Sequence, residues 1–261
     1  MGAMKSIRAG KGLGDSLYLQ GVVRHLVNKG HSLSVCSNWP EVFRDLPVKV
    51  EPFRRNAEIN AHYTLRKGRP ETDQFEDCCL QAGIREPVEF RLDWKATKSL
   101  IDGLPKPVVC VLIYRLPMDR ADGFAADLLP DFRQMQRMID ALKGRATIVQ
   151  IGSGKPLKHY EGIDLDLANK TSVSELLDMA SKADGFLGYC SFVVPLAESL
   201  DKPALFLWSS KGVTSRTPYI RQITPKKILH KESSLYVFDG DPNPERGVEV
   251  LLSEISCRKS D

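Results

Sequence analysis

KSIRAGKGLGDSL, residues 5–17, is the stretch that most strongly indicates the fold, because a strand-like run passes through a glycine-rich turn into a helical pattern. Gly10, Gly12 and Gly14 fall within five residues. Glycine permits positive φ angles and a close approach of the backbone to a ligand. The helix that we expect next would direct free N–H groups and the positive end of its dipole to the same place. The stretch therefore predicts a strand–turn–helix unit with a binding site at its turn.

Asp15 follows the last glycine of this turn and distinguishes it from the common nucleotide-binding loops. A Walker A loop needs Lys and then Ser or Thr after its last glycine, and a dinucleotide-binding loop needs a third glycine where Asp15 stands. Because a carboxylate repels phosphate, Asp15 suggests a chemical role beside a bound anion. Two interpretations stay open: Asp15 is the N-cap of the helix, which stabilises by about 1 kcal/mol, or it is a catalytic base.

Strand and helix patterns alternate along the rest of the chain. The first half predicts strands at residues 7–9, 33–36 and 48–53, and helices at residues 17–30 and 73–82. The second half predicts strands at residues 108–114, 146–151 and 204–208, and helices at residues 127–142, 172–183, 195–200 and 245–256. A strand, a helix and a second strand in this order form a βαβ unit and imply a parallel sheet.

The pattern restarts at LPKP, residues 104–107, ahead of a continuous apolar strand. We therefore predict an α/β protein of two Rossmann-like domains, residues 1–104 and residues 105–261. A chain of 261 residues is long enough for two compact domains.

The composition is that of an ordinary globular protein, with 42% hydrophobic and 27% charged residues. The net charge of +4 permits an anionic ligand without arguing for nucleic acid. We expect no transmembrane segment and no signal peptide, and we interpret the opening MGAM as a cloning scar. None of the six cysteines forms a C-x-x-C pair, so we expect no metal site and a reduced, cytoplasmic protein.

A second constellation begins at Asp166 and continues to Phe206, where a helix, a strand, a polar turn, a short helix and a further strand follow one another. The turn after Gly188 falls at the carboxyl end of a strand, where open α/β sheets bind ligands. Ser191 offers a hydroxyl to a phosphate there, and the helix expected near Pro195 directs its N-terminus to the same spot.

These two constellations together resemble the heptosyltransferase-like glycosyltransferases, glycosyltransferase family 9, which have the GT-B fold. The family's G-x-G-D turn is matched by Gly12-Leu13-Gly14-Asp15, and its later motifs are matched from Asp166 to Gly188 and from Leu196 to Phe206. The resemblance covers the first 50 residues and roughly residues 105–210.

The resemblance implies two Rossmann-like domains that face each other across a cleft. The C-terminal domain would hold a nucleotide-diphospho-sugar, the N-terminal domain would bind a hydroxyl acceptor, and Asp15 would be the general base of an inverting transfer that needs no cofactor and no metal. The residues that we expect at phosphate and donor are Gly12, Gly14, Arg115, Arg120, Gly152, Ser153, Thr171, Gly188, Cys190, Ser191 and Lys211. Those expected at the acceptor are Arg54, Arg55 and Arg66, whose other interpretation is a solvated charged face.

The chain also departs from the family pattern. The family has an Asp-Ser/Thr-Gly-x-x-His box where this chain has CSFVVP, residues 190–195, so only the hydroxyl of Ser191 remains. After the strand at residues 108–114 the family places a phosphate-contacting lysine, for which Arg115 or Arg120 would have to substitute. The first half is short for the family, which predicts a different acceptor site.

Two other functions stay open. A sugar-nucleotide epimerase would use the same donor site, and a binding protein that lost the transfer chemistry would explain the altered box. The acceptor stays open between a saccharide, a lipid-linked glycan such as lipopolysaccharide core, a modified nucleic acid, a protein and a small molecule. The sequence does not indicate the sugar, the nucleotide or the oligomeric state.

Overall fold

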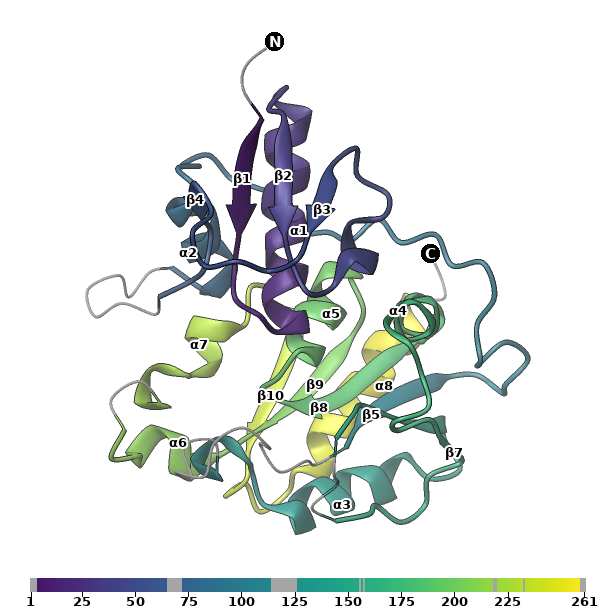
Figure 1. The fold of residues 1–261 in the computed structure, drawn as a ribbon. Coiled ribbons are helices and arrows are strands. Elements are labelled where there is room, and N and C mark those ends of the chain that lie inside the picture. The colour runs from purple at the N-terminus through teal and green to yellow at the C-terminus, as the bar shows by residue number, and fades with distance from the viewer. Residues whose placement is uncertain are drawn as a thin grey trace.

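Two separate parallel β-sheets form the framework of the protein (Figure 1). The computed structural model describes residues 4–64, 72–113, 126–154, 156, 158–217, 220–231 and 233–258. Within these residues the first sheet has four strands and lies in the N-terminal half, and the second has six strands and lies in the C-terminal half.

The first sheet has the strand order β3-β2-β1-β4. Its strands are β1 (Lys5–Arg8), β2 (Leu33–Cys36), β3 (Lys49–Glu51) and β4 (Ile59–Asn60). The helices of this half are α1 (Leu13–Asn28), the short 3-10 helix η1 (Pro40–Phe43) and α2 (Gln74–Gln81). Helix α1 ends before Gly30, whose φ of 86° is a conformation that glycine adopts without strain.

The second sheet has the strand order β10-β9-β8-β5-β6-β7, and all its pairs are parallel. Its strands are β5 (Val108–Leu112), β6 (Thr147–Ile151), β7 (Leu165–Asp166), β8 (Gly185–Tyr189), β9 (Ala204–Trp208) and β10 (Ser234–Phe238). If the six strands are numbered 1 to 6 in chain order and read from the β7 edge, this is the doubly wound order 3-2-1-4-5-6. The direction in which successive strands are added reverses between β5 and β8.

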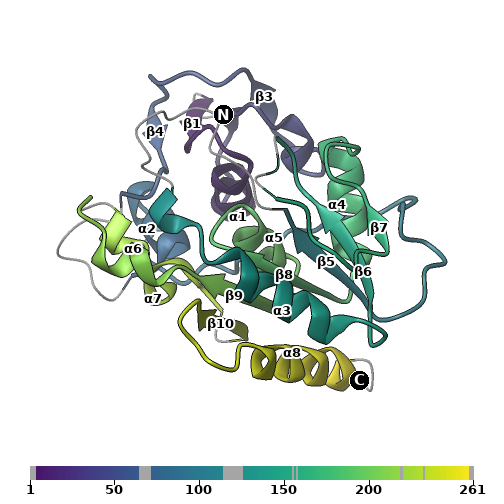
Figure 2. The ribbon, with the colours of Figure 1, turned by 90° about the horizontal axis from the view of Figure 1, so that it is seen from below.

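Helices cover both faces of the second sheet. The helices of this half are α3 (Phe132–Leu142), α4 (Val173–Lys182), α5 (Val193–Ser199), α6 (Ser210–Thr214), α7 (Pro225–Ile228) and α8 (Glu245–Cys257), with the 3-10 helices η2 (Ala126–Leu128) and η3 (Ile220–Gln222). Figure 2 shows α8 on one face and α5 on the opposite face, next to α1. The surroundings of the β8 glycines support this arrangement. A Cβ on Gly185 would contact Ile255 of α8, whereas a Cβ on Gly188 would contact Val193 of α5.

The predicted strands and long helices are confirmed, with ends that differ by a few residues. Helix α3 starts at Phe132 instead of residue 127, and α5 starts at Val193 instead of residue 195. The sequence pattern did not indicate β4, β7, β10, α6 and α7. All five have two to five residues, which is too short for a clear periodic pattern, and β10 is also an edge strand without buried residues.

Residues 88–95, here called the strap, run between the halves and bind both of them. The Leu92 N–H donates to the Ser199 carbonyl at 2.7 Å, and Trp94 Nε1 donates to Asp178 Oδ1 at 2.7 Å, so the strap is fixed to α5 and α4. On the other side Arg24 of α1 donates to the Glu89 carbonyl at 2.7 Å. The expected division at residue 104 lies between the two sheets, after this strap.

No helix within the described residues is long and apolar enough to cross a membrane. All six cysteines are free thiols. Cys78 and Cys79 are buried positions of α2.

Candidate functional site

Each sheet reverses its winding once, and crevices at such switch points are where open α/β sheets bind ligands, outside the carboxyl ends of the strands. In the first sheet the switch point lies between β1 and β4, which pair in parallel. The turn after β1 and residues 61–63 after β4 therefore meet there. Figure 1 shows β1 and β2 pointing toward the second half of the molecule.

The glycines of the first turn serve close packing within the chain. The expectation of positive φ angles is wrong, because Gly10, Gly12 and Gly14 are not among the residues with positive φ, and Gly12 has φ −74° and ψ 159°. A Cβ on Gly10 would lie 2.1 Å from Asp15 Oδ2, and one on Gly14 would lie 3.3 Å from the Phe192 Cα. These two glycines make room for the Asp15 carboxylate and for the turn after β8.

Asp15 lies inside α1, in its first turn, and Gly12 is the N-cap residue. The interpretation of Asp15 as the N-cap is therefore wrong in position, although the carboxylate does bind the helix start: Oδ2 accepts a hydrogen bond from the Gly12 N–H at 2.9 Å. The second oxygen, Oδ1, lies 3.6 Å from Nε2 of His62, which follows β4. One oxygen thus stabilises the helix and the other faces a histidine.

Aromatic and basic side chains surround this turn. Trp39 donates from Nε1 to the Lys11 carbonyl at 2.9 Å, which holds the segment after β2 against the turn. The Lys11 ammonium and the Arg8 guanidinium lie 5.6 Å and 5.8 Å from the centre of the Phe53 ring. This edge of the first sheet therefore combines ring faces with positive charge.

The residues expected at the acceptor follow β3. Arg54 and Arg55 are exposed, and the Arg54 guanidinium forms an ion pair with Glu51 at 3.5 Å. The Arg55 carbonyl accepts a hydrogen bond from Arg8 Nε at 2.7 Å. Arg66 lies outside the described residues. An acceptor role for these arginines stays a prediction.

The second switch point lies between β5 and β8. Arg115 and Arg120 follow β5 in the sequence and lie outside the described residues. After β8 the Ser191 hydroxyl accepts a hydrogen bond from the Val193 N–H at 3.4 Å, next to the start of α5, whose N-cap residue is Phe192. Burial raises the pKa of the Cys190 thiol to about 12, which keeps it protonated near neutrality.

Gly188 lies near the end of β8, one residue before the strand ends, and its expected contact with the donor stays a prediction. A Cβ at this position would lie 2.7 Å from Cγ1 of the buried Val193. The structural reason for glycine here is thus the close packing of α5 on β8.

The remaining residues expected at the donor follow other strands. Gly152, with φ 117°, follows β6, and its carbonyl accepts a hydrogen bond from the Asn169 N–H at 2.9 Å. Ser153 comes next and is exposed. Thr171 follows the edge strand β7 and precedes the N-cap of α4, and Lys211 is exposed on α6 after β9. None of these four lies in the segments that directly follow β5 and β8.

The two switch points are in contact. Because Gly14 approaches the Phe192 backbone, the first turn of α1 packs directly on the turn after β8. Asp15 and Ser191, which the sequence analysis singled out separately, therefore belong to segments that touch. His62 was missed, because β4 has two residues and gives no readable strand pattern.

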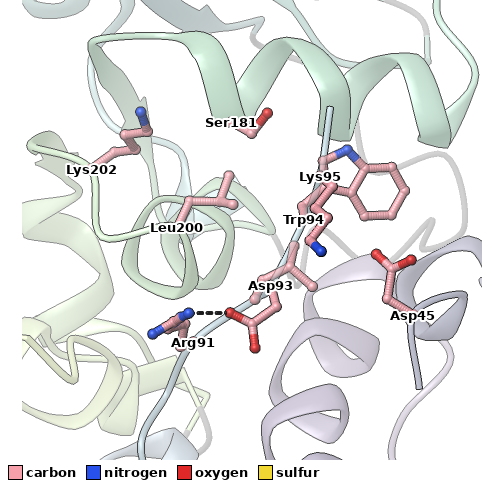
Figure 3. Close-up of a pocket in the computed structure, with 9 residues that line it drawn as sticks. Asp45, Arg91, Asp93, Trp94, Lys95, Ser181, Leu200 and Lys202 are labelled. Carbon is pink, nitrogen blue, oxygen red and sulfur yellow. Dashed lines mark ion pairs between the residues drawn. The ribbon is translucent and has the colours of Figure 1, made fainter. Parts of the chain in front are cut away.

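A separate open pocket of about 780 Å³ lies along the strap and is shown in Figure 3. It is lined by residues of both halves, among them Asp45, Trp94 and Lys202. Arg91 and Asp93 on its wall form an ion pair at 2.6 Å. Neither Asp15 nor Ser191 lines this pocket, so it is distinct from the switch points. Among the described residues there is no group of three or more His, Cys, Asp or Glu that could hold a metal ion.

Solved structures of glycosyltransferases share this fold. The glycosyl transferase family 9 protein from Veillonella parvula DSM 2008 has a TM-score of 0.65 at 11% identity, over 96% of this chain and 97% of that one. E. coli ADP-heptose lipopolysaccharide heptosyltransferase II has a TM-score of 0.60 at 13% identity, over 99% and 100%. E. coli heptosyltransferase WaaC with ADP-2-deoxy-2-fluoro heptose has a TM-score of 0.57 at 11% identity, over 97% and 99%.

No protein-family model and no curated protein matches the chain. The similarity to solved structures establishes the fold, and the expected resemblance to heptosyltransferase-like glycosyltransferases is confirmed at this level.

Proposed function

We propose that this protein is a glycosyltransferase that moves a sugar from a nucleotide-diphospho-sugar to a hydroxyl acceptor. The observation that carries the proposal is the contact between the two switch points, which brings the first turn of α1, where Asp15 lies, against the turn after β8. In the proposed GT-B arrangement, residues 1–104 bind the acceptor and residues 105–261 bind the donor, across a cleft between them.

The proposed reaction is an inverting displacement. The acceptor oxygen attacks the anomeric carbon, the bond from that carbon to the diphosphate oxygen breaks, and the nucleoside diphosphate leaves with the electron pair. The site must accept the acceptor's proton, and this step depends on Asp15, the carboxylate of the first switch point. Ser191 and the turn after β8 are proposed to hold the donor diphosphate. The solved heptosyltransferase WaaC carries an ADP-sugar analogue, so ADP-sugars come first among donors to test.

The test is release of nucleoside diphosphate from a panel of sugar nucleotides in the presence of candidate acceptors. We expect Asp15→Asn to lower turnover by about 100-fold or more and to keep donor affinity. The fold should survive, since the asparagine oxygen can still accept from the Gly12 N–H. Asp45→Asn is the matched control, because Asp45 is an exposed carboxylate of the same half that lies outside the switch points. Full activity of a folded Asp15→Asn protein would refute the role of Asp15.

A donor-binding protein without transfer activity is the second candidate, and the box after β8 favours it. Residues 189–195 contain no charged side chain. This candidate predicts that a sugar nucleotide raises the melting temperature while no acceptor mixture gives turnover.

A further inference from the structure

His62 occupies the first switch point together with Asp15. The Ala61 N–H donates to the Arg8 carbonyl at 2.8 Å, which extends the β1–β4 pairing to the residue before His62. The His62 ring packs on Tyr63 with ring centres 4.7 Å apart, and Tyr63 contacts Tyr18 of α1 edge to face at 6.1 Å. The backbone and the neighbouring ring therefore place this imidazole beside the start of α1.

The two oxygens of Asp15 have different surroundings. Oδ2 is occupied by the Gly12 N–H at 2.9 Å, and Oδ1 faces His62 Nε2 at 3.6 Å. The Asp15 side chain is 16% exposed and the His62 side chain 39% exposed. The imidazole is thus the more accessible member of the pair. No described residue forms a hydrogen bond with the other ring nitrogen, Nδ1.

We propose that His62 is the group that takes the acceptor's proton, and that Asp15 is the positioning residue that orients the imidazole through Nε2. This inference rests on the proposed glycosyl transfer. In the step, the acceptor O–H gives its proton to Nδ1 as its oxygen bonds to the anomeric carbon, and the carbon–oxygen bond to the diphosphate breaks. The imidazolium that forms is balanced by the Asp15 carboxylate at Oδ1.

Two chemical considerations support this division of roles. Histidine is the side chain whose ordinary titration range lies nearest neutrality, which suits a general base. An aspartate that contacts one ring nitrogen fixes the tautomer and leaves the other nitrogen as acceptor. The distance of 3.6 Å is that of an ion pair and longer than a hydrogen bond. Catalytic hydrogen bonds are often long before substrate binds and shorten in the complex.

The kinetic test compares His62→Ala and His62→Gln with Asp15→Asn in the full chain. We expect both His62 variants to lower kcat by about 100-fold or more while the affinity for nucleoside diphosphate stays unchanged. Added imidazole should restore part of the activity of His62→Ala and none of that of Asp15→Asn. His31→Ala, an exposed histidine of the same half, is the control and should behave as wild type.

A readout independent of activity is the tautomer of His62, measured by long-range ¹H–¹⁵N correlation on histidine-labelled protein. We expect the proton on Nε2 in the wild type and a loss of this preference in Asp15→Asn. Two results would overturn the role of His62 without affecting the proposed function. One is a proton fixed on Nδ1. The other is wild-type kcat in a folded His62→Gln protein when Asp15→Asn is inactive. Absence of transfer by the wild type with every donor and acceptor would overturn both.

Discussion

Glu198 shows how much one residue of α5 affects the junction between the halves. Its side chain is buried, and Oε1 accepts hydrogen bonds from the His230 N–H at 3.0 Å, the Lys231 N–H at 3.1 Å and the Ser234 hydroxyl at 2.8 Å. Oε2 is buried without a hydrogen-bond partner among the described residues. Burial raises the pKa of this carboxyl to about 7, although the three donors oppose the shift.

This shift makes stability depend on pH with a definite sign. The folded protein holds the Glu198 proton up to about pH 7, whereas an unfolded glutamate loses it near pH 4.5. The stabilising contribution is therefore complete below the unfolded value and is lost as the pH rises through about 7, by roughly 3 kcal/mol in total. Glu198→Gln has no proton to lose, so its unfolding free energy relative to wild type should rise by roughly that amount between about pH 4.5 and about pH 8.

Urea unfolding of both proteins across this range is the measurement. Glu254→Gln, on an exposed part of α8, is the control and should follow the wild type at every pH. A difference between Glu198→Gln and wild type that stays constant with pH would show that the carboxyl is ionised throughout.

At the scale of elements, the sequence indicates most clearly those strands and helices that bury many side chains. Strand β5 is buried at all five positions and reads as a continuous apolar run, and α1 has an apolar face along its length. Strand β4 has two residues, and its place beside β1 depends on long-range pairing that no local pattern records. For this reason Asp15 could be singled out from the sequence and His62 could not.

The glycines illustrate the same limit. Gly10, Gly14 and Gly188 were interpreted as ligand-contacting positions, yet each is small because another part of the chain lies against it. A glycine in the sequence shows that no side chain is present at that position, but it does not show which neighbouring residue occupies the space. Their neighbours, Asp15, Phe192 and Val193, are known only from the folded structure.

The packing of α5 on β8 gives a prediction at this scale. Gly188→Ala would place a Cβ 2.7 Å from Val193 Cγ1, so we expect a loss of about 1–3 kcal/mol in unfolding free energy. Val193→Ala removes the clashing methyl groups. The double variant should therefore lose less unfolding free energy than the sum of the losses of the two single variants. Chemical unfolding of the four proteins measures this coupling. Strictly additive losses would mean that the methyl contact is not the reason for glycine.

At the scale of the whole molecule, contacts from several segments join the two halves. The Asp73 carboxylate, before α2, lies 2.7 Å from His230 Nδ1 and forms an ion pair with it when the imidazole is protonated. Helix α1 packs against the start of α5 through Gly14 and Phe192. Burial lowers the pKa of His230, but the neighbouring Asp73 carboxylate outweighs this, so the pKa is raised overall. Together with the strap, these contacts predict that the halves unfold as one cooperative unit.

Trp94→Phe tests this cooperativity. The change removes the bond from Nε1 to Asp178 Oδ1 and leaves that buried carboxylate without this donor, at an expected cost of about 1–3 kcal/mol. Because the bond joins the strap to α4, hydrogen exchange measured separately on β1 and on β8 should give the same lowered opening free energy in both sheets. Trp39→Phe is the matched control, since its indole bonds a carbonyl within the N-terminal half and is partly exposed. If Trp94→Phe accelerated exchange in only one sheet, the halves would open independently, and domain motion would become available to the proposed transfer cycle.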